Sequence, residues 1–197
     1  MIPVTLAAVV LLGLVAVLAT RGGEDEDAAA ALEQTRPVTV SGDPLVALPD
    51  VEDPAVGRPA PELEGAAFDG SPVRIAADGR PKVLVFLADW CPHCQRELPV
   101  LTKWLADNGA PADVDLYGIA TGTSPDRPNY PPSSWLDEGG WTPPVLADDA
   151  EGSAARAMGL SAYPFFVEVD GENTVRARRS GELTVEQWEQ LLARAAS

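Results

Sequence analysis

The sequence predicts an α/β domain in which a mixed central β-sheet carries helices on both faces. The apolar run over residues 82–88 is typical of a strand buried on both sides. A helical pattern begins directly after it at Pro92. Strands and helices then alternate as far as residues 165–178, where two strand patterns flank a turn. Alternation followed by an antiparallel hairpin favours a mixed sheet.

The elements follow one another in a regular order. They are strands over 71–75, 82–88 and 114–120, helices over 92–107, near 134–136, over 150–158 and over 184–196, an extended piece over 144–146, and hairpin strands over 165–169 and 174–178. Leu98, Leu101 and Leu105 have the spacing of a buried helix face. Thr184 and Gln187 have the spacing of a capping box, which marks the start of the last helix. The Pro-, Ser- and Gly-rich residues 121–140 are interpreted as an insertion.

Length and charge limit the possible functions. The chain has 197 residues, of which 46% are hydrophobic, and this is enough for one compact domain with appendages. Thirty acidic and 14 basic residues give a formal net charge of −16. Nucleic-acid binding is therefore disfavoured, because phosphates would be repelled. A monomer is expected.

The N-terminus predicts a membrane anchor. Residues 2–20 are apolar except for Thr5, Gly13 and Thr20. A helix of this length rises about 28 Å, close to the hydrocarbon thickness of a bilayer. A cleaved signal peptide is the alternative, and it would leave a secreted protein. The anchor is favoured, since the run is long for a signal and no basic residue precedes it.

The expected organisation is an anchor over residues 1–20, a flexible acidic and proline-containing linker over 21–56, and a folded domain over 57–197. The single basic residue Arg21 after the apolar run weakly favours a domain inside the cell. The chain has two cysteines, Cys91 and Cys94, and disulfides form and persist in oxidising compartments. We therefore expect the domain on the outer face of the cytoplasmic membrane.

The two cysteines and the only histidine lie within four consecutive residues, Cys91, Pro92, His93 and Cys94. A framework of several disulfides is excluded. A zinc site needs four ligands, and the chain offers too few of the usual kind. Neither a metal nor another cofactor is expected. A structural disulfide and half of an intermolecular metal site remain as alternatives to redox chemistry.

A buried strand that leads into a cysteine, followed at once by a helix, suits a reactive thiolate. Free N–H groups and the positive end of the helix dipole stabilise negative charge there. Pro92 fits the first helical position, where its missing N–H costs nothing. A protonated His93 would add a positive charge nearby. Cys94 can reach Cys91 within one turn, so Cys91 is the expected exposed attacker and Cys94 the resolving thiol.

The segment over residues 85–99, Val-Phe-Leu-Ala-Asp-Trp-Cys-Pro-His-Cys-Gln-Arg-Glu-Leu-Pro, resembles the thioredoxin superfamily, and within it the membrane-anchored TlpA-like disulfide oxidoreductases. The resemblance extends over about residues 57–196 and includes Trp90, Glu97 and Pro99. It implies a thioredoxin-like fold, exchange with protein thiols and disulfides, and a membrane partner that resets the cysteines.

The resemblance also implies roles for residues outside the cysteine motif. Pro164 would be cis and face the cysteines, and the backbone of Tyr163 would pair with the substrate chain. Tyr163 departs from the small or β-branched residue usual at this position. Val85 stands where classical thioredoxins have a buried acid, so Glu97 is the candidate proton-transfer group. A solvated glutamate is the alternative for Glu97.

The sequence thus predicts an extracytoplasmic disulfide oxidoreductase whose catalytic residues are Cys91, Cys94 and Glu97. Trp90, Pro92 and His93 would support the site. The inter-cysteine pair Pro-His is typical of strongly oxidising enzymes, whereas the surrounding frame resembles reductases, so the direction of electron flow stays open. A peroxidase-like redoxin and a binding module without turnover are the alternative functions. Arg176, Arg178 and Arg179 are expected on a solvated strand face.

Overall fold

The centre of the molecule is a five-stranded mixed sheet. The computed structural model describes residues 33–196. The sheet has the order β6-β5-β4-β7-β8, with β4 (Lys82–Leu87) in the middle. The parallel strands β5 (Asp115–Ala120) and β6 (Val145–Ala147) lie on one side of it. The antiparallel strands β7 (Phe165–Val169) and β8 (Val175–Ser180) lie on the other. The predicted mixed sheet and its hairpin are confirmed.

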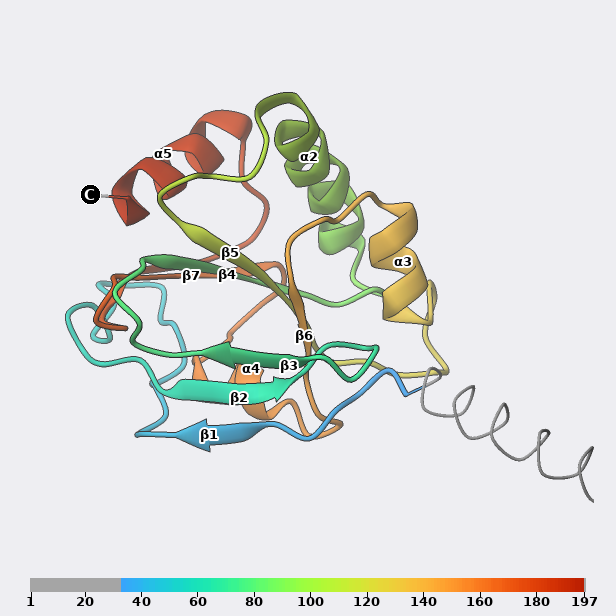
Figure 1. The fold of residues 1–197 in the computed structure, drawn as a ribbon, viewed down its shortest axis with the longest axis horizontal. Coiled ribbons are helices and arrows are strands. Elements are labelled where there is room, and N and C mark those ends of the chain that lie inside the picture. Colours follow the sequence, from blue (N-terminus) through green and yellow to red (C-terminus); the bar gives the residue numbers. More distant parts are fainter. Residues whose placement is uncertain (1–32, 197) are drawn as a thin grey trace, which may run out of the picture. The chain divides into compact units, whose positions relative to one another are not determined.

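Helices cover the sheet as the alternating pattern predicted. The helices are α2 (Pro92–Asn108), α3 (Pro132–Glu138), α4 (Ser153–Ala157) and α5 (Val185–Ala195). In Figure 1, α2 and α5 lie on one face of the five-stranded sheet, and α4 lies on the other. The capping box at the start of α5 is present, because Thr184 Oγ1 accepts from Gln187 N and Gln187 Oε1 accepts from Thr184 N.

Strand β4 separates two hydrophobic cores. Val83 and Leu87 belong to the core shared with α2 and α5, whereas Leu84 and Phe86 belong to the core on the α4 side. All four side chains are 2% exposed or less. A strand buried on both faces explains why this run is continuously apolar.

A second sheet was not predicted. It contains β1 (Thr39–Ser41), β2 (Glu62–Ala66) and β3 (Pro72–Ile75), all antiparallel in the order β1-β2-β3, and only β3 was expected. Strand β2 has the sequence Glu-Leu-Glu-Gly-Ala, which is poor in the β-branched and aromatic residues that favour strands. Leu63, its single fully buried side chain, joins the α4-side core. Tertiary pairing, not local preference, therefore forms this strand.

The linker expected over residues 21–56 needs correction for the part that the structure describes. Residues 34–56 include β1 and pack on the domain. Leu45 and Ala55 are 5% and 1% exposed, and Leu45 N donates to Ala157 O at 2.8 Å. The side chain of Asp53 forms an ion pair with the buried Arg178. The prolines and charges of this stretch predicted irregular structure, but these contacts hold it against the domain. The folded domain therefore starts before Gly57.

The expected membrane-spanning segment over residues 1–20 lies outside the described residues. Within residues 33–196, no helix combines the length and the apolar character needed to cross a bilayer.

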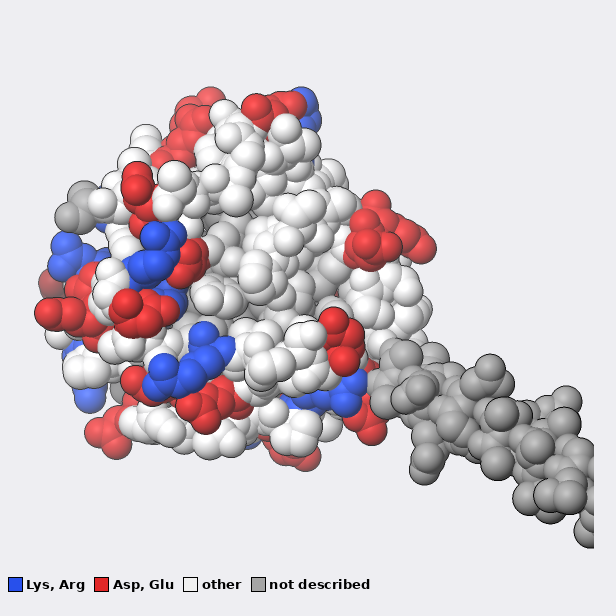
Figure 2. All heavy atoms as spheres, viewed as in Figure 1, with Lys and Arg blue, Asp and Glu red and all other residues white. Residues whose placement is uncertain are grey.

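Charges of both signs occur together on the surface. On the face drawn in Figure 2, basic and acidic side chains gather toward the edges and the middle is mainly uncharged. Arg74 on β3, for example, pairs with Glu62 at 2.8 Å and with Glu64 at 2.9 Å on the neighbouring strand. The acidic excess of the sequence is thus not concentrated in the middle of this face.

Candidate active site

Cys91 lies where the central strand passes into helix α2. Strand β4 ends at Leu87, and a tight turn follows in which Cys91 N donates to Ala88 O at 3.0 Å. Cys91 is the N-cap of α2, with extended backbone angles of φ −78° and ψ 120°, and Pro92 occupies the first turn. The predicted order, a buried strand that leads into the cysteine and a helix that follows at once, is confirmed, and Cys91 lies beside the free N–H groups of the helix start.

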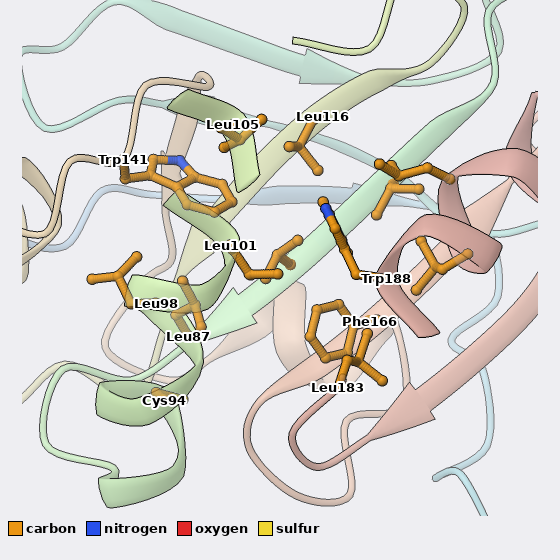
Figure 3. Close-up of a cluster of buried hydrophobic side chains, with 14 of the residues drawn as sticks. Leu87, Cys94, Leu98, Leu101, Leu105, Leu116, Trp141, Phe166, Leu183 and Trp188 are labelled. Atoms are coloured by element: carbon orange, nitrogen blue, oxygen red, sulfur yellow. The ribbon is translucent and has the colours of Figure 1, made fainter. Parts of the chain in front are cut away.

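The two cysteines differ in exposure. Both are free thiols, and Cys91 is 6% exposed whereas Cys94 is fully buried. Cys91 is thus less open than the sequence suggested, although it remains the more accessible of the two. Figure 3 shows Cys94 at the end of a cluster of buried side chains, next to Leu87 and Leu98. Burial raises the pKa of the Cys94 thiol well above its usual range, although Ala88 N lies 3.5 Å from Cys94 Sγ and acts in the opposite sense.

Glu97 is a buried acid on the same helix. It is only 1% exposed, so the alternative of a solvated glutamate is wrong. Its Oε2 accepts a hydrogen bond from Leu183 N at 2.9 Å, and its Oε1 has no hydrogen-bond partner among residues 33–196. Burial raises the pKa of Glu97 to about 7. A smaller part of the rise in the Cys94 pKa comes from the charge of Glu97, so the two groups are electrostatically coupled.

Trp90 is held by the segment that the sequence identified as an insertion. Its indole Nε1 donates to Gly122 O at 2.8 Å. The Arg127 guanidinium lies 4.5 Å from the ring centroid, and the Tyr163 ring meets Trp90 edge-on at 5.8 Å between centroids. The segment after β5 therefore forms a wall beside the cysteine motif, as only the tertiary structure reveals.

The Tyr163–Pro164 peptide bond is cis, as the resemblance implied. A second cis bond, Tyr130–Pro131, was not predicted. Gly122 approaches Tyr163 so closely that a Cβ on Gly122 would lie 2.8 Å from Tyr163 Oη. A pocket of about 220 Å³ adjoins this contact and is bordered by α4. Its lining residues include Thr121, Gly122, Ala155, Leu160 and Tyr163.

The carboxylate of Glu182 holds His93 and Arg96, a contact that the sequence gave no reason to expect. His93 Nδ1 lies 2.6 Å from Glu182 Oε1, and Arg96 Nη2 lies 2.6 Å from the same oxygen. These hydrogen bonds hold the pKa of Glu182 below its usual range, and the contribution of Arg96 is larger than that of His93. Because 89 residues separate His93 from Glu182, no local pattern signals the pair.

Asp89 is a second buried acid near the cysteines that sequence reasoning missed. The residue is 1% exposed, and neither carboxyl oxygen has a well-formed hydrogen bond within the described part of the chain. Burial raises the pKa of Asp89, and the nearby N–H groups of Asp89 and Trp90 offset part of this rise. Its backbone O accepts from Gln95 Nε2 and Asn129 Nδ2, both at 3.0 Å. The sequence did contain one signal for this site, since Asp89 is a charged residue that directly follows the buried apolar run over residues 82–88.

Within residues 33–196, no group of three or more His, Cys, Asp or Glu side chains is arranged to hold a metal ion. The chemistry that this arrangement supports is that of its two thiols and of the adjacent buried carboxyls.

Comparison with known proteins relates the chain to one family. Residues 56–178, more than half of its length, match the model of the AhpC/TSA family. The chain is 29% identical over 147 residues to the thiol:disulfide interchange protein DsbE of Yersinia pestis, and the alignment covers 71% of this chain and 72% of that protein. It is 28% identical over 138 residues to the methylamine utilization protein MauD of Paracoccus denitrificans, and the alignment covers 68% of this chain and 64% of MauD. The match therefore spans slightly less than two thirds of MauD.

A solved structure supports the fold assignment. A thiol:disulfide interchange protein of the thioredoxin family from Chlorobium tepidum superposes with a TM-score of 0.55 at 24% identity. The superposition covers 75% of this chain and all of the other. The described domain therefore has a thioredoxin-like α/β fold with a mixed sheet and flanking helices.

Proposed function

Since the family model matches more than half of its length, the chain belongs to the AhpC/TSA family, and from this premise we propose that Cys91 and Cys94 form a redox pair that exchanges disulfides with client proteins. Its relatives named DsbE are thiol:disulfide interchange proteins, and the chain is a thioredoxin-like disulfide oxidoreductase. The proposal rests chiefly on the contrast between Cys91, which caps α2 and keeps some exposure, and Cys94, which is fully buried.

The exchange proceeds in two displacement steps. The Cys91 thiolate attacks one sulfur of a client disulfide, and the other client sulfur leaves as a thiolate and takes up a proton. The Cys94 thiol then loses its proton and attacks the Cys91 sulfur. The mixed disulfide breaks, the second client thiol is released, and a Cys91–Cys94 disulfide remains. In this direction the client gains two electrons that the protein loses, and the reverse sequence oxidises a client dithiol.

Glu97 is the proposed proton-transfer group for Cys94. A thiol whose pKa is raised by burial needs a base to become a nucleophile and an acid to receive its proton on leaving. A carboxyl with a pKa of about 7 can serve both purposes near neutral pH. Val85, in the position of the acid of classical thioredoxins, is fully buried and apolar, so it cannot take part in proton transfer.

We expect Glu97→Gln to slow resolution of the mixed disulfide by on the order of 10²-fold, the low end of general acid–base effects. In the wild type this step should accelerate as pH rises through about 7, because Glu97 then becomes the ionised base. The variant should lack this inflection. Stopped-flow measurements between pH 5 and 9 check the profile, with the exposed Glu138→Gln as the matched control. An unchanged rate and profile in Glu97→Gln would remove Glu97 from the mechanism.

The remaining site residues are proposed to support client binding. The backbone of Tyr163, ahead of cis-Pro164, would pair with the extended client chain, and the adjoining pocket would border that chain. Trp90, held by the segment after β5, would pack beside the cysteines, and Pro92 would fix the first turn of α2. His93, when protonated, would favour the Cys91 thiolate.

We propose that residues 1–20 anchor the chain in the cytoplasmic membrane and hold the catalytic domain on its outer face. The part of the linker before residue 34 would connect the two, and a membrane partner would reset the cysteines. The expected results are that the full chain fractionates with membranes and that added protease digests it in spheroplasts. A variant without residues 1–20 should be soluble and active. Full protection from the protease in spheroplasts with intact membranes would contradict the topology.

An insulin-reduction assay combined with a thiol-oxidation assay tests the proposed activity. The wild type should accelerate at least one of the two reactions, and Cys91→Ser should accelerate neither. The alternative of a binding module predicts no turnover with either protein. A peroxidase-like redoxin would consume hydroperoxide in preference, and it is disfavoured because both cysteines lie together in one helix start.

A further inference from the structure

Glu182 lies in the loop between β8 and α5, and its carboxylate reaches the first turn of α2. Its Oε1 is 2.6 Å from His93 Nδ1 and 2.6 Å from Arg96 Nη2, and Arg96 Nε is 3.1 Å from the same oxygen. His93 lies between the two cysteines and directly precedes Cys94, and Arg96 lies about one turn further along the helix. One carboxylate thus contacts both basic groups beside the redox pair.

The same loop also contacts the buried acid of the site. Leu183, the residue after Glu182, donates its N–H to Glu97 Oε2 at 2.9 Å. Two consecutive residues therefore fix side chains on two turns of α2. This arrangement makes the loop over residues 181–183 a structural partner of the first turns of α2, through His93, Arg96 and Glu97.

The charge of Arg96 acts on Cys91. The pKa of Arg96 is raised mainly by its hydrogen bond to Glu182, and a smaller contribution comes from the charge of Cys91. The interaction is mutual, so a cationic Arg96 stabilises the Cys91 thiolate. The carboxylate of Glu182 opposes this effect because it lies against the same cation. His93 and Arg96 on α2 and Glu182 in the facing loop are thus in mutual contact next to the cysteine pair.

We propose that Glu182 is a positioning residue that sets the redox equilibrium of the Cys91–Cys94 pair. By neutralising the Arg96 cation, it reduces the stabilisation of the Cys91 thiolate. The reduced form of the pair is therefore less stable than it would be with Pro92 and His93 between the cysteines but without Glu182. As a result, the Cys91–Cys94 disulfide is a weaker oxidant. This inference rests on the proposed disulfide exchange, and it explains how an oxidase-type Pro-His pair can function in a reductase-like frame.

The test is the equilibrium between the protein and glutathione at pH 7 in low salt. Glu182→Gln keeps a hydrogen-bond acceptor and removes the charge. We expect it to shift the equilibrium toward the reduced protein by about two- to fivefold, the range of an exposed ion pair. Arg96→Gln should shift the equilibrium in the opposite direction. Both shifts should shrink in 1 M salt, where screening is strong. A structural role alone would not give shifts of opposite sign.

Glu172→Gln, an exposed change in the β7–β8 turn, is the matched control and should leave the equilibrium unchanged. The proposal is overturned if Glu182→Gln leaves the equilibrium where it is, or shifts it in the same direction as Arg96→Gln. A wild-type protein that forms no Cys91–Cys94 disulfide would instead refute the underlying function. The two failures are therefore distinguishable in one experiment.

Discussion

Replacing Cys94 with serine is expected to trap client proteins as covalent adducts on Cys91. In the proposed mechanism the first displacement needs only Cys91, which lies at the N-cap of α2 and keeps some exposure. The second displacement needs Cys94, which in the proposed mechanism attacks the mixed disulfide from within the molecule at high effective concentration. Cys94→Ser removes only this second step. Adducts should appear on non-reducing gels, disappear when reductant is added, and yield the client identities by mass spectrometry.

Cys91→Ser is the matched control, because it keeps the buried thiol and removes the one with residual exposure. It should trap far fewer adducts and lose measurable turnover. A better yield of adducts from Cys91→Ser, or none from either variant, would show that the roles of the two cysteines are assigned wrongly.

Arg178→Leu is expected to destabilise the domain by about 3–5 kcal/mol, the usual cost of removing one partner from a buried ion pair. The side chain of Arg178 is fully buried, and that of Asp53 is 11% exposed. Two donors of Arg178 bind the Asp53 carboxylate at 2.9 and 2.6 Å, and Nη1 donates to Val46 O and Met158 O, both at 2.8 Å. The substitution would remove these four hydrogen bonds, and Asp53 Oδ1 would keep the N–H of Ala55 as a donor. Urea unfolding followed by tryptophan fluorescence measures the loss.

Arg176→Leu on the same strand is the control for this prediction. Its side chain is 53% exposed and lies 3.9 Å from Asp170, so its removal should cost less than about 1 kcal/mol. Equal losses from the two substitutions would contradict the structural role of Arg178.

The ion pair between Asp53 and Arg178 should also make the stability of the domain depend on pH in acid. The hydrogen bond from Arg178 to Asp53 holds the pKa of Asp53 below the usual value. An acid with a lowered folded-state pKa contributes stability above its unfolded pKa of about 4, and this contribution is lost as pH falls through the folded-state value. The stability gap between wild type and Arg178→Leu should therefore narrow below pH 4. If the difference in unfolding free energy between wild type and Arg178→Leu stays constant down to pH 2, the ion pair is not the cause of that difference.

The elements next to the cysteines could be predicted because their signals are local. The apolar run of β4, the proline after Cys91 and the capping box of Thr184 each depend on residues within a few positions. The cis bond before Pro164 followed from the resemblance instead. Together these signals were sufficient to locate the cysteine motif at the end of the central strand.

The missed features depend on contacts between distant parts of the chain. Arg178 was expected on a solvated strand face, but the N-terminal segment covers it through Asp53 and Val46. The register between β7 and β8 also shifts at Glu168 and Val169, which disturbs the simple alternation of faces in β8. Sequence spacing alone could signal neither effect.

The candidate site shows the same division. Glu97 could be identified as sharing a helix face with Cys94, but its burial depends on the loop that carries Leu183. Glu182 and the wall beside Trp90 come from segments far from the motif in sequence. The candidate cysteines could therefore be identified from local sequence, whereas the groups in contact with their helix required the tertiary structure.

The central claim is that Cys91 and Cys94 form one reversible redox pair. The most direct test is to equilibrate the domain in glutathione buffers of increasing oxidising strength, quench with acid, and alkylate the free thiols before mass spectrometry. The account predicts a single reversible transition in which both thiols disappear together and a Cys91–Cys94 disulfide forms with the loss of two hydrogens. Independent oxidation of the two thiols, stable glutathione adducts without a linking disulfide, or no transition at all would contradict it.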